Sequence, residues 1–311
     1  YNVVVGDEAG TAITTGDNNT GIGYQALLGT TTGSSNTGVG KDSLKANTTG
    51  SNNTAVGNLA LDANTTASAN TAVGNSALTA NTTGDRNVAV GANALDANTV
   101  GTKNVAVGVD SLGTNTKGRR NVALGDSALA NQEPSSAIDM YNTAVGHGAG
   151  SSVTTGVLNT LVGGLAGDAL TTGDNNIAIG YQALSGDTQG DRNVAVGIQA
   201  LLSQNFTSST DVYNTAVGFA AGASITTGVQ NTLVGGRSGD SLTDADFNVA
   251  MGFEALAADT LGSKSTAIGF QALQDQNFTS ATDSLNTAMG YRAGANVSTG
   301  VQNTIVGATA L

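Results

Sequence analysis

The sequence contains no cysteine, no tryptophan, one proline and one histidine in 311 residues. Without cysteine, the chain cannot use the disulfides on which many small extracellular domains depend, so its stability must come from another source. The single histidine, His147, gives no basis for a catalytic triad or a histidine-based metal site. We therefore expect no enzymatic activity, no cofactor and no metal site.

Charged residues are also scarce. They make up 11% of the chain, whereas about 25% is usual for globular proteins. The net charge of −12 disfavours a nucleic-acid partner, because a phosphate backbone requires a basic surface. Apolar runs are only a few residues long, so we expect no membrane insertion by this segment.

Glycine is abundant, with 44 residues, and it marks a repeat. A glycine that follows a short apolar phrase recurs 18 times, and we call it the marker glycine. The markers are Gly6, Gly23, Gly40, Gly57, Gly74, Gly91, Gly108, Gly125, Gly146, Gly163, Gly180, Gly197, Gly218, Gly235, Gly252, Gly269, Gly290 and Gly307. Fourteen of the 17 spacings are 17 residues and three are 21. Such regular spacing indicates a repeat architecture.

The three long spacings show a second period. They end at Gly146, Gly218 and Gly290, which are 72 residues apart, so a four-repeat unit is superimposed on the sequence from about residue 126 onward. We therefore expect residues 1–311 to form one continuous solenoid. Both ends stop within the repeat, which we interpret as excision from a longer fibre.

Each position of the repeat accepts few residue types. Four residues before the marker stands Asn in 17 of 18 repeats, with Ser265 as the exception. The columns assigned to a structural ladder include Asn70, Asn87, Asn104, Asn121, Gly74, Gly91, Gly108 and Gly125. Stacked coils place equivalent side chains about 4.8 Å apart, where Asn amides can form hydrogen bonds along the stack.

The period also predicts the fold class. Seventeen residues are too few for a helix–turn–helix repeat. The Val-rich phrase is five residues long, which is typical of a strand, and glycine permits the turn that follows it. The pattern predicts an all-β fold, a parallel β-solenoid with 18 coils of 17 or 21 residues.

Both faces of the predicted strand are apolar. Ala89 points to one side, while Val88 and Val90 point to the other, because side chains alternate along a strand. The small alanine suits the inside of the coil. The opposite face, which includes Val73, Val90 and Val107, needs a covering layer that the rest of the sequence does not provide. We predict that this face is buried against further copies of the chain.

The repeats resemble a known family. Asn87-Val88-Ala89-Val90-Gly91 and Ser265-Thr266-Ala267-Ile268-Gly269 are similar to the head repeat of YadA-type trimeric autotransporter adhesins, and related repeats occur in phage tail-fibre-like proteins. The resemblance covers essentially the whole chain. It implies a left-handed parallel β-roll, with three chains packed around a threefold axis. The repeat differs in being a few residues longer and in having Asn where the family motif has Ser.

The resemblance also implies a function. We expect a structural or adhesive fibre segment of a cell-surface trimeric adhesin, which would be extracellular and homotrimeric and would contact a host or surface ligand, either a glycan or a protein. A virion tail-fibre shaft or head, located on the virion surface, is the alternative. The threonines of the closing loops leave an ice-binding solenoid as a minor alternative.

Two groups of residues are candidates for ligand contact. The insertions at about residues 130–141, 203–213 and 274–285 lengthen the closing loop of a coil and should protrude, as binding loops on rigid scaffolds do. They carry Tyr141, Phe206, Tyr213 and Phe278. A basic column of Arg86, Lys103 and Arg120 could contact an anionic glycan or a lipid headgroup, or could simply form a solvated face.

Aromatic residues form a third column directly after the marker. Its members are Tyr24, Tyr181, Phe219, Phe253, Phe270 and Tyr291. If exposed, these rings would form an adhesive stripe. The alternative is that they pack between protomers.

Overall fold

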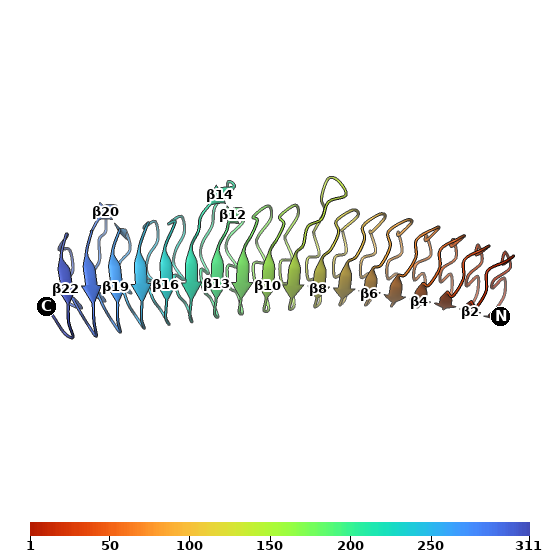
Figure 1. Ribbon diagram of the computed structural model, residues 1–311, viewed down its shortest axis with the longest axis horizontal. Coiled ribbons are helices and arrows are strands. Elements are labelled where there is room, and N and C mark those ends of the chain that lie inside the picture. The colour runs from red at the N-terminus through yellow and green to blue at the C-terminus, as the bar shows by residue number, and fades with distance from the viewer. The chain divides into compact units, whose positions relative to one another are not determined.

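The computed structural model describes residues 1–311 and contains strands and turns but no helix. Consequently, no helix is available that could cross a membrane. The chain divides into two units, Tyr1–Thr155 and Gly156–Leu311. In both, each repeat forms one coil with one strand, so the chain is a parallel β-solenoid of about 18 turns (Figure 1). The predicted all-β solenoid is confirmed.

The first unit contains nine strands. They are β1 (Val3–Val5), β2 (Thr20–Ile22), β3 (Thr37–Val39), β4 (Thr54–Val56), β5 (Thr71–Val73), β6 (Val88–Val90), β7 (Val105–Val107), β8 (Val122–Leu124) and β9 (Thr143–Val145). Successive strands are parallel and in register, so that Ala89 pairs with Ala106 and Val90 with Val107. The sequence columns therefore become straight columns of side chains.

The second unit repeats this arrangement. Its main strands are β10 (Thr160–Val162), β11 (Ile177–Ile179), β13 (Val194–Val196), β15 (Thr215–Val217), β16 (Thr232–Val234), β17 (Val249–Met251), β19 (Thr266–Ile268), β21 (Thr287–Met289) and β22 (Thr304–Val306). Two short pairs lie beside them, β12 (Gly190–Asp191) with β14 (Thr210–Asp211), and β18 (Gly262–Ser263) with β20 (Thr282–Asp283).

Each main strand is three residues long, not the five that the sequence phrase suggested. The Asn before the strand and the marker glycine after it do not belong to the strand, because they have other structural roles. The Asn side chain forms a ladder, and the glycine makes the corner of the coil.

Alanine and leucine fill the interior of the coil. In the coil of Gly91, the side chains of Ala89, Ala94 and Leu95 are fully buried, while Val88 and Val90 point outward and are half-buried. The predicted inward position of Ala89 is confirmed. Leu95 lies in the left-handed region with φ 51°, a conformation that costs an L-residue roughly 1–2 kcal/mol. Burial of an apolar leucine side chain contributes about 1.5–3 kcal/mol and offsets this cost.

The interior volume is maintained by paired changes. In six coils, a glycine stands four residues after the marker in place of the leucine: Gly10, Gly150, Gly167, Gly222, Gly239 and Gly294. Three residues after that glycine, each of these coils has an aliphatic residue: Ile13, Val153, Leu170, Ile225, Leu242 and Val297. A Cβ placed on Gly167 would lie 2.8 Å from Leu161 Cδ2 and 2.9 Å from Leu170 Cδ1. The glycine coils are therefore filled by side chains from two other positions.

The predicted Asn column does join the coils, but mainly through the backbone. Asn87 donates its backbone N–H to Asn70 Oδ1 (2.8 Å), and its Nδ2 donates to the carbonyl oxygen of Gly101 (2.9 Å). In turn, its Oδ1 accepts the backbone N–H of Asn104 (3.0 Å). Through its backbone N–H and its side-chain amide together, each buried asparagine thus joins three successive coils. These bonds satisfy polar groups that would otherwise be buried without partners.

A second Asn column forms the direct amide ladder. It lies seven residues after the marker and includes Asn47, Asn64, Asn81 and Asn98. Asn98 Nδ2 donates to Asn81 Oδ1 (2.9 Å), Asn81 to Asn64 (3.0 Å) and Asn64 to Asn47 (2.8 Å). The aliphatic residues of the glycine coils occupy this same position, so a coil has either a polar ladder residue or an extra apolar one here.

The marker glycines lie where successive coils approach most closely. Gly91 has φ 137°, in a region that residues with a side chain rarely adopt, and a Cβ there would lie 2.4 Å from the carbonyl oxygen of Gly108. Both the backbone conformation and the space require glycine. The neighbouring atoms belong to the backbone of the next coil, so they cannot move without disturbing the register.

We predict that Gly91→Ala lowers the free energy of unfolding by about 3 kcal/mol or more, because it combines a strained backbone with overpacking. Urea denaturation followed by circular dichroism measures the loss. Gly164→Ala is the matched control, since Gly164 has no positive φ and a Cβ there meets only Tyr181 Cδ2, at 3.6 Å, and its ring neighbour Cε2. Equal stability of the two variants would contradict the steric role of the marker.

Candidate functional site

The outward faces of the strands form an apolar surface in each unit. Val73, Val90 and Val107 are half-buried in the single chain. Larger exposed side chains in the outward strand positions include Ile177, Ile179, Met251 and Met289 of the second unit. As expected, these side chains point outward from the coil. Their burial against further copies of the chain stays a prediction about the assembled protein.

The basic column lies on the closing-loop side. Arg86, Lys103 and Arg120 are all exposed, and all three have φ near 60°. Arg120 Nε forms an ion pair with Asp139 Oδ2 (3.0 Å), and its guanidinium lies 5.4 Å from the centre of the Tyr141 ring. Arg120 is therefore already held by the insertion, which leaves Arg86 and Lys103 as the open cations of this column.

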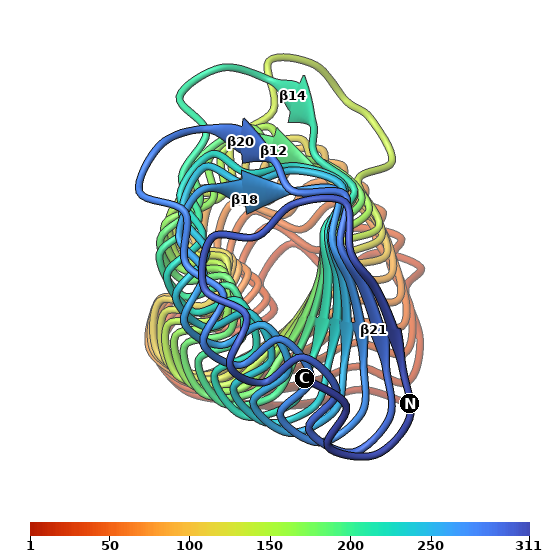
Figure 2. The same ribbon diagram turned by 90° about the vertical axis from the view of Figure 1, so that its left-hand side faces the viewer.

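The insertions are braced by the same arrangement. In the second unit, Arg192 pairs with Asp211 and lies 5.5 Å from the Tyr213 ring centre. Lys264 Nζ pairs with Asp283 Oδ2 (2.6 Å). Figure 2 shows the insertions that carry β14 and β20 projecting beyond the coils of this unit. A basic residue of the preceding coil thus ties down each insertion through its aspartate.

The four aromatic residues expected to contact a ligand have two different environments. Tyr141 and Tyr213 are 48% and 50% exposed, as expected. Phe206 and Phe278 are only 8% and 6% exposed, so the prediction that these two rings are presented on protruding loops is wrong.

A buried carboxylate explains the position of the Phe206 segment. Asp187 is fully buried, and its oxygens accept hydrogen bonds from Gln204 Nε2 (2.6 Å), the Gly190 N–H (3.1 Å) and the Phe206 N–H (3.1 Å). Asp259 makes the equivalent three bonds, including one from the Phe278 N–H (3.0 Å). Sequence analysis missed these two aspartates. Their signal was an acidic residue in the column seven residues after the marker, where the other coils carry an amide, an aliphatic residue or a threonine.

The aromatic column is exposed, and its rings stack in the second unit. Phe253 and Phe270 have ring centres 5.7 Å apart, and Phe270 and Tyr291 have ring centres 5.3 Å apart. Both distances lie within the range of about 4.5–7 Å that is favoured for aromatic pairs. Exposed apolar rings in a continuous row are typical of a contact surface.

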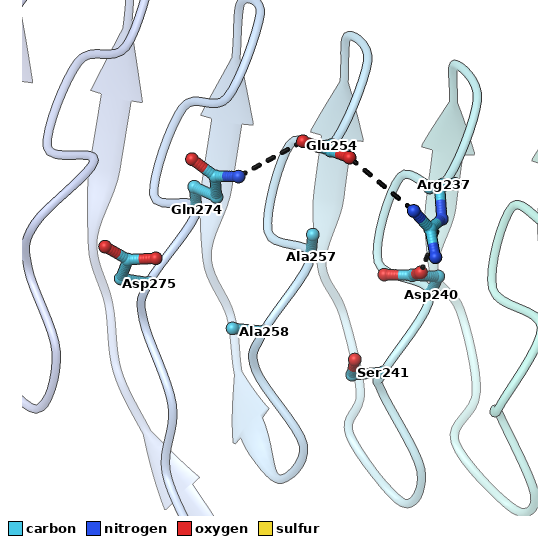
Figure 3. A pocket seen from close by; sticks show the side chains of 8 residues that line it. All are labelled: Arg237, Asp240, Ser241, Glu254, Ala257, Ala258, Gln274 and Asp275. Carbon is cyan, nitrogen blue, oxygen red and sulfur yellow. Dashed lines mark hydrogen bonds and ion pairs between the residues drawn. The ribbon is translucent and has the colours of Figure 1, made fainter.

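A shallow groove of about 280 Å³ lies in the second unit (Figure 3), and Glu254 in its lining directly follows Phe253 of the aromatic column. Its lining comprises Arg237, Asp240, Ser241, Glu254, Ala257, Ala258, Gln274 and Asp275. Arg237 bridges two carboxylates, at 3.4 Å from Asp240 Oδ2 and 3.8 Å from Glu254 Oε1. Gln274 Nε2 donates to Glu254 Oε2 (3.1 Å). The groove therefore offers both hydrogen-bond donors and acceptors.

Burial raises the pKa of Asp240 above its ordinary value of 3.8, and the nearby Glu254 carboxylate adds to this effect, while Arg237 opposes it. No group of three or more His, Asp or Glu side chains is placed so that it could hold a metal ion. A comparison with models of known protein families and a comparison with curated proteins find no match to the chain.

The raised pKa predicts a pH effect. The folded state favours protonated Asp240, so this carboxyl group contributes stability below about pH 3.8 that is lost as pH rises through the raised folded-state pKa. We expect Asp240→Asn to raise the melting temperature at pH 7 and to have a diminishing effect as pH falls to 3.8. Circular dichroism melts of both proteins across this range provide the measurement. A difference independent of pH would rule out titration of Asp240 as its cause.

Proposed function

We propose that this chain is a structural and adhesive segment of an extracellular homotrimeric fibre, part of a cell-surface adhesin. The observation that carries this proposal is the apolar outward face of the strands. The coil interior is already filled by residues such as Ala89 and Leu95, so the valines and isoleucines outside cannot be accommodated in the same chain. A second copy offers the same face at the same pitch, which makes self-association the simplest way to cover it.

The number three and the location at a cell surface come from the resemblance to YadA-type head repeats. A virion tail-fibre shaft with the same repeats is the alternative, because it would use the same solenoid and the same outward face. Ice binding is less well supported. The closing-loop hydroxyl of Thr82 donates to the Thr99 carbonyl oxygen (3.1 Å), and that of Thr99 donates to Thr116 (3.2 Å), so both serve the coil-to-coil ladder.

We predict that Val90→Asp prevents assembly, because the trimer would bury a carboxylate without a partner, at a cost that exceeds that of an ordinary unpaired polar group. Sedimentation velocity should show a trimer for the unchanged protein and a monomer or unfolded chain for the variant. Asn52→Asp is the matched control, since it adds the same charge at an exposed closing-loop position. A stable monomer of the unchanged protein, or a trimer of Val90→Asp, would contradict the proposal.

A further inference from the structure

The aromatic column of the second unit has a gap at Gly236. This glycine stands where the preceding and following coils carry Phe219 and Phe253. A Cβ added to Gly236 would meet only the Phe253 ring, at 3.3 Å from Cδ2 and 3.6 Å from Cε2. No atom of Phe219 lies within 4 Å of that position. The row of rings is therefore interrupted by a notch, with Gly236 as its floor and an aromatic residue on each side.

The spacing of the flanking coils would accommodate one ring-shaped group in the notch. Phe219 and Phe253 belong to coils two steps apart, which corresponds to about 10 Å. Stacked rings prefer centre-to-centre distances of about 4.5–7 Å, so two such steps span the gap. Phe219 and Phe253 are 55% and 45% exposed, which leaves the notch open to solvent.

The polar groove of Figure 3 adjoins this notch along the backbone. Arg237 directly follows Gly236, and Glu254 directly follows Phe253. The backbone N–H of Arg237 donates to the Phe219 carbonyl oxygen (2.8 Å), and that of Glu254 donates to the Gly236 carbonyl oxygen (3.0 Å). The residues that form the notch are therefore linked directly to Arg237 and Glu254, which form one edge of the groove.

We propose that the notch and the groove together bind a neutral saccharide, an inference that deepens the adhesive part of the proposed function and rests on it. One sugar ring would lie with its apolar C–H face against Phe253, and its hydroxyl groups would bond to Arg237, Glu254 and Asp240. The groove has one cation and three carboxylates, Asp240, Glu254 and Asp275, so an acidic sugar would be repelled. A phenylalanine from a partner would fill the notch but would form no hydrogen bonds with the polar edge, whose groups already pair with one another.

The test uses the whole chain and saturation-transfer NMR with neutral tetrasaccharides of glucose, galactose, mannose and N-acetylglucosamine, and with sialyllactose as the anionic comparison. At least one neutral sugar should bind at about 5 mM or below, and Gly236→Phe should weaken this binding about tenfold or more. Gly236 has no positive φ, so its backbone accepts a side chain, and the new Cβ requires the Phe253 ring to move by a few tenths of an ångström. Gly164→Phe, in the same column beside Tyr181, should leave the affinity within about twofold.

A second variant tests the saccharide site if Gly236→Phe does not fold. Phe253→Leu keeps an apolar side chain but removes the ring face, and it should also weaken binding about tenfold. Arg237→Gln should also weaken binding, because it removes the one cation of the groove. Its melting curve is measured alongside, since Asp240 and Glu254, the ion-pair partners of Arg237, are only 21% and 20% exposed.

Three results would overturn the inference. These are the absence of binding by any neutral sugar, tighter binding of sialyllactose, and unchanged affinity in the notch variants. Loss of the trimer in Gly236→Phe would also overturn it, since the notch would then hold a ring of another copy. Sedimentation of the unchanged protein separates this outcome from failure of the proposed function, because a trimer that binds no sugar contradicts only the saccharide site.

Discussion

The close approach of successive coils at the marker glycines is the constraint on which the rest of the structure depends. At Gly91, the backbone of the next coil leaves no space for a side chain. That contact fixes the pitch, and the pitch brings Ala89 opposite Ala106 in the parallel strand pair. Once the register is fixed, every position of the repeat becomes a column along the solenoid axis. A residue type that can pair with itself is then favoured in each buried column, which explains the ladders of asparagine.

Register also explains how the interior accepts variation. The space inside a coil is set by its neighbours, so a change at one interior position requires an opposite change at another. Replacement of leucine by glycine accompanies an aliphatic residue three positions later, as in Gly167 and Leu170. The added side chain displaces the polar ladder residue of that coil. Such a coil thus loses the hydrogen bonds of the ladder residue and gains an apolar side chain in its interior, while the marker glycine and the Asn four residues before it are unchanged.

Much of this structure could be predicted from the sequence, because 18 copies of the repeat show which positions accept only a few residue types. The inward direction of Ala89 and the outward direction of Val90 follow from strand alternation. Strand length did not follow, since Asn87 and Gly91 look like part of the apolar phrase. The path between the strands was also hidden, because Leu95 adopts a left-handed conformation that leucine rarely takes.

The candidate site was less predictable than the fold, because the environment of its residues depends on contacts between different coils. Tyr213 and Phe206 belong to one insertion and have similar chemistry, yet one ring is exposed and the other is buried. The difference arises from Asp187, which binds the Phe206 backbone from another coil. Local sequence carries no information on this contact, although the 72-residue period does repeat it with Asp259 and Phe278.

Function in such a fold depends on columns that the solenoid leaves free. The marker and the Asn columns are restricted by packing, whereas the position after the marker is exposed and accepts many residues. In the first unit it includes Asn58, Asn75 and Asp126, and in the second unit it includes Tyr181, Phe219 and Phe253. The stacked rings of Phe253, Phe270 and Tyr291 add a contact between coils, but the backbone accepts polar residues in this column equally well, so the coil does not require aromatic residues there. Their concentration in the second unit, where Glu254 of the polar groove directly follows Phe253, is the observation on which the proposed saccharide site rests.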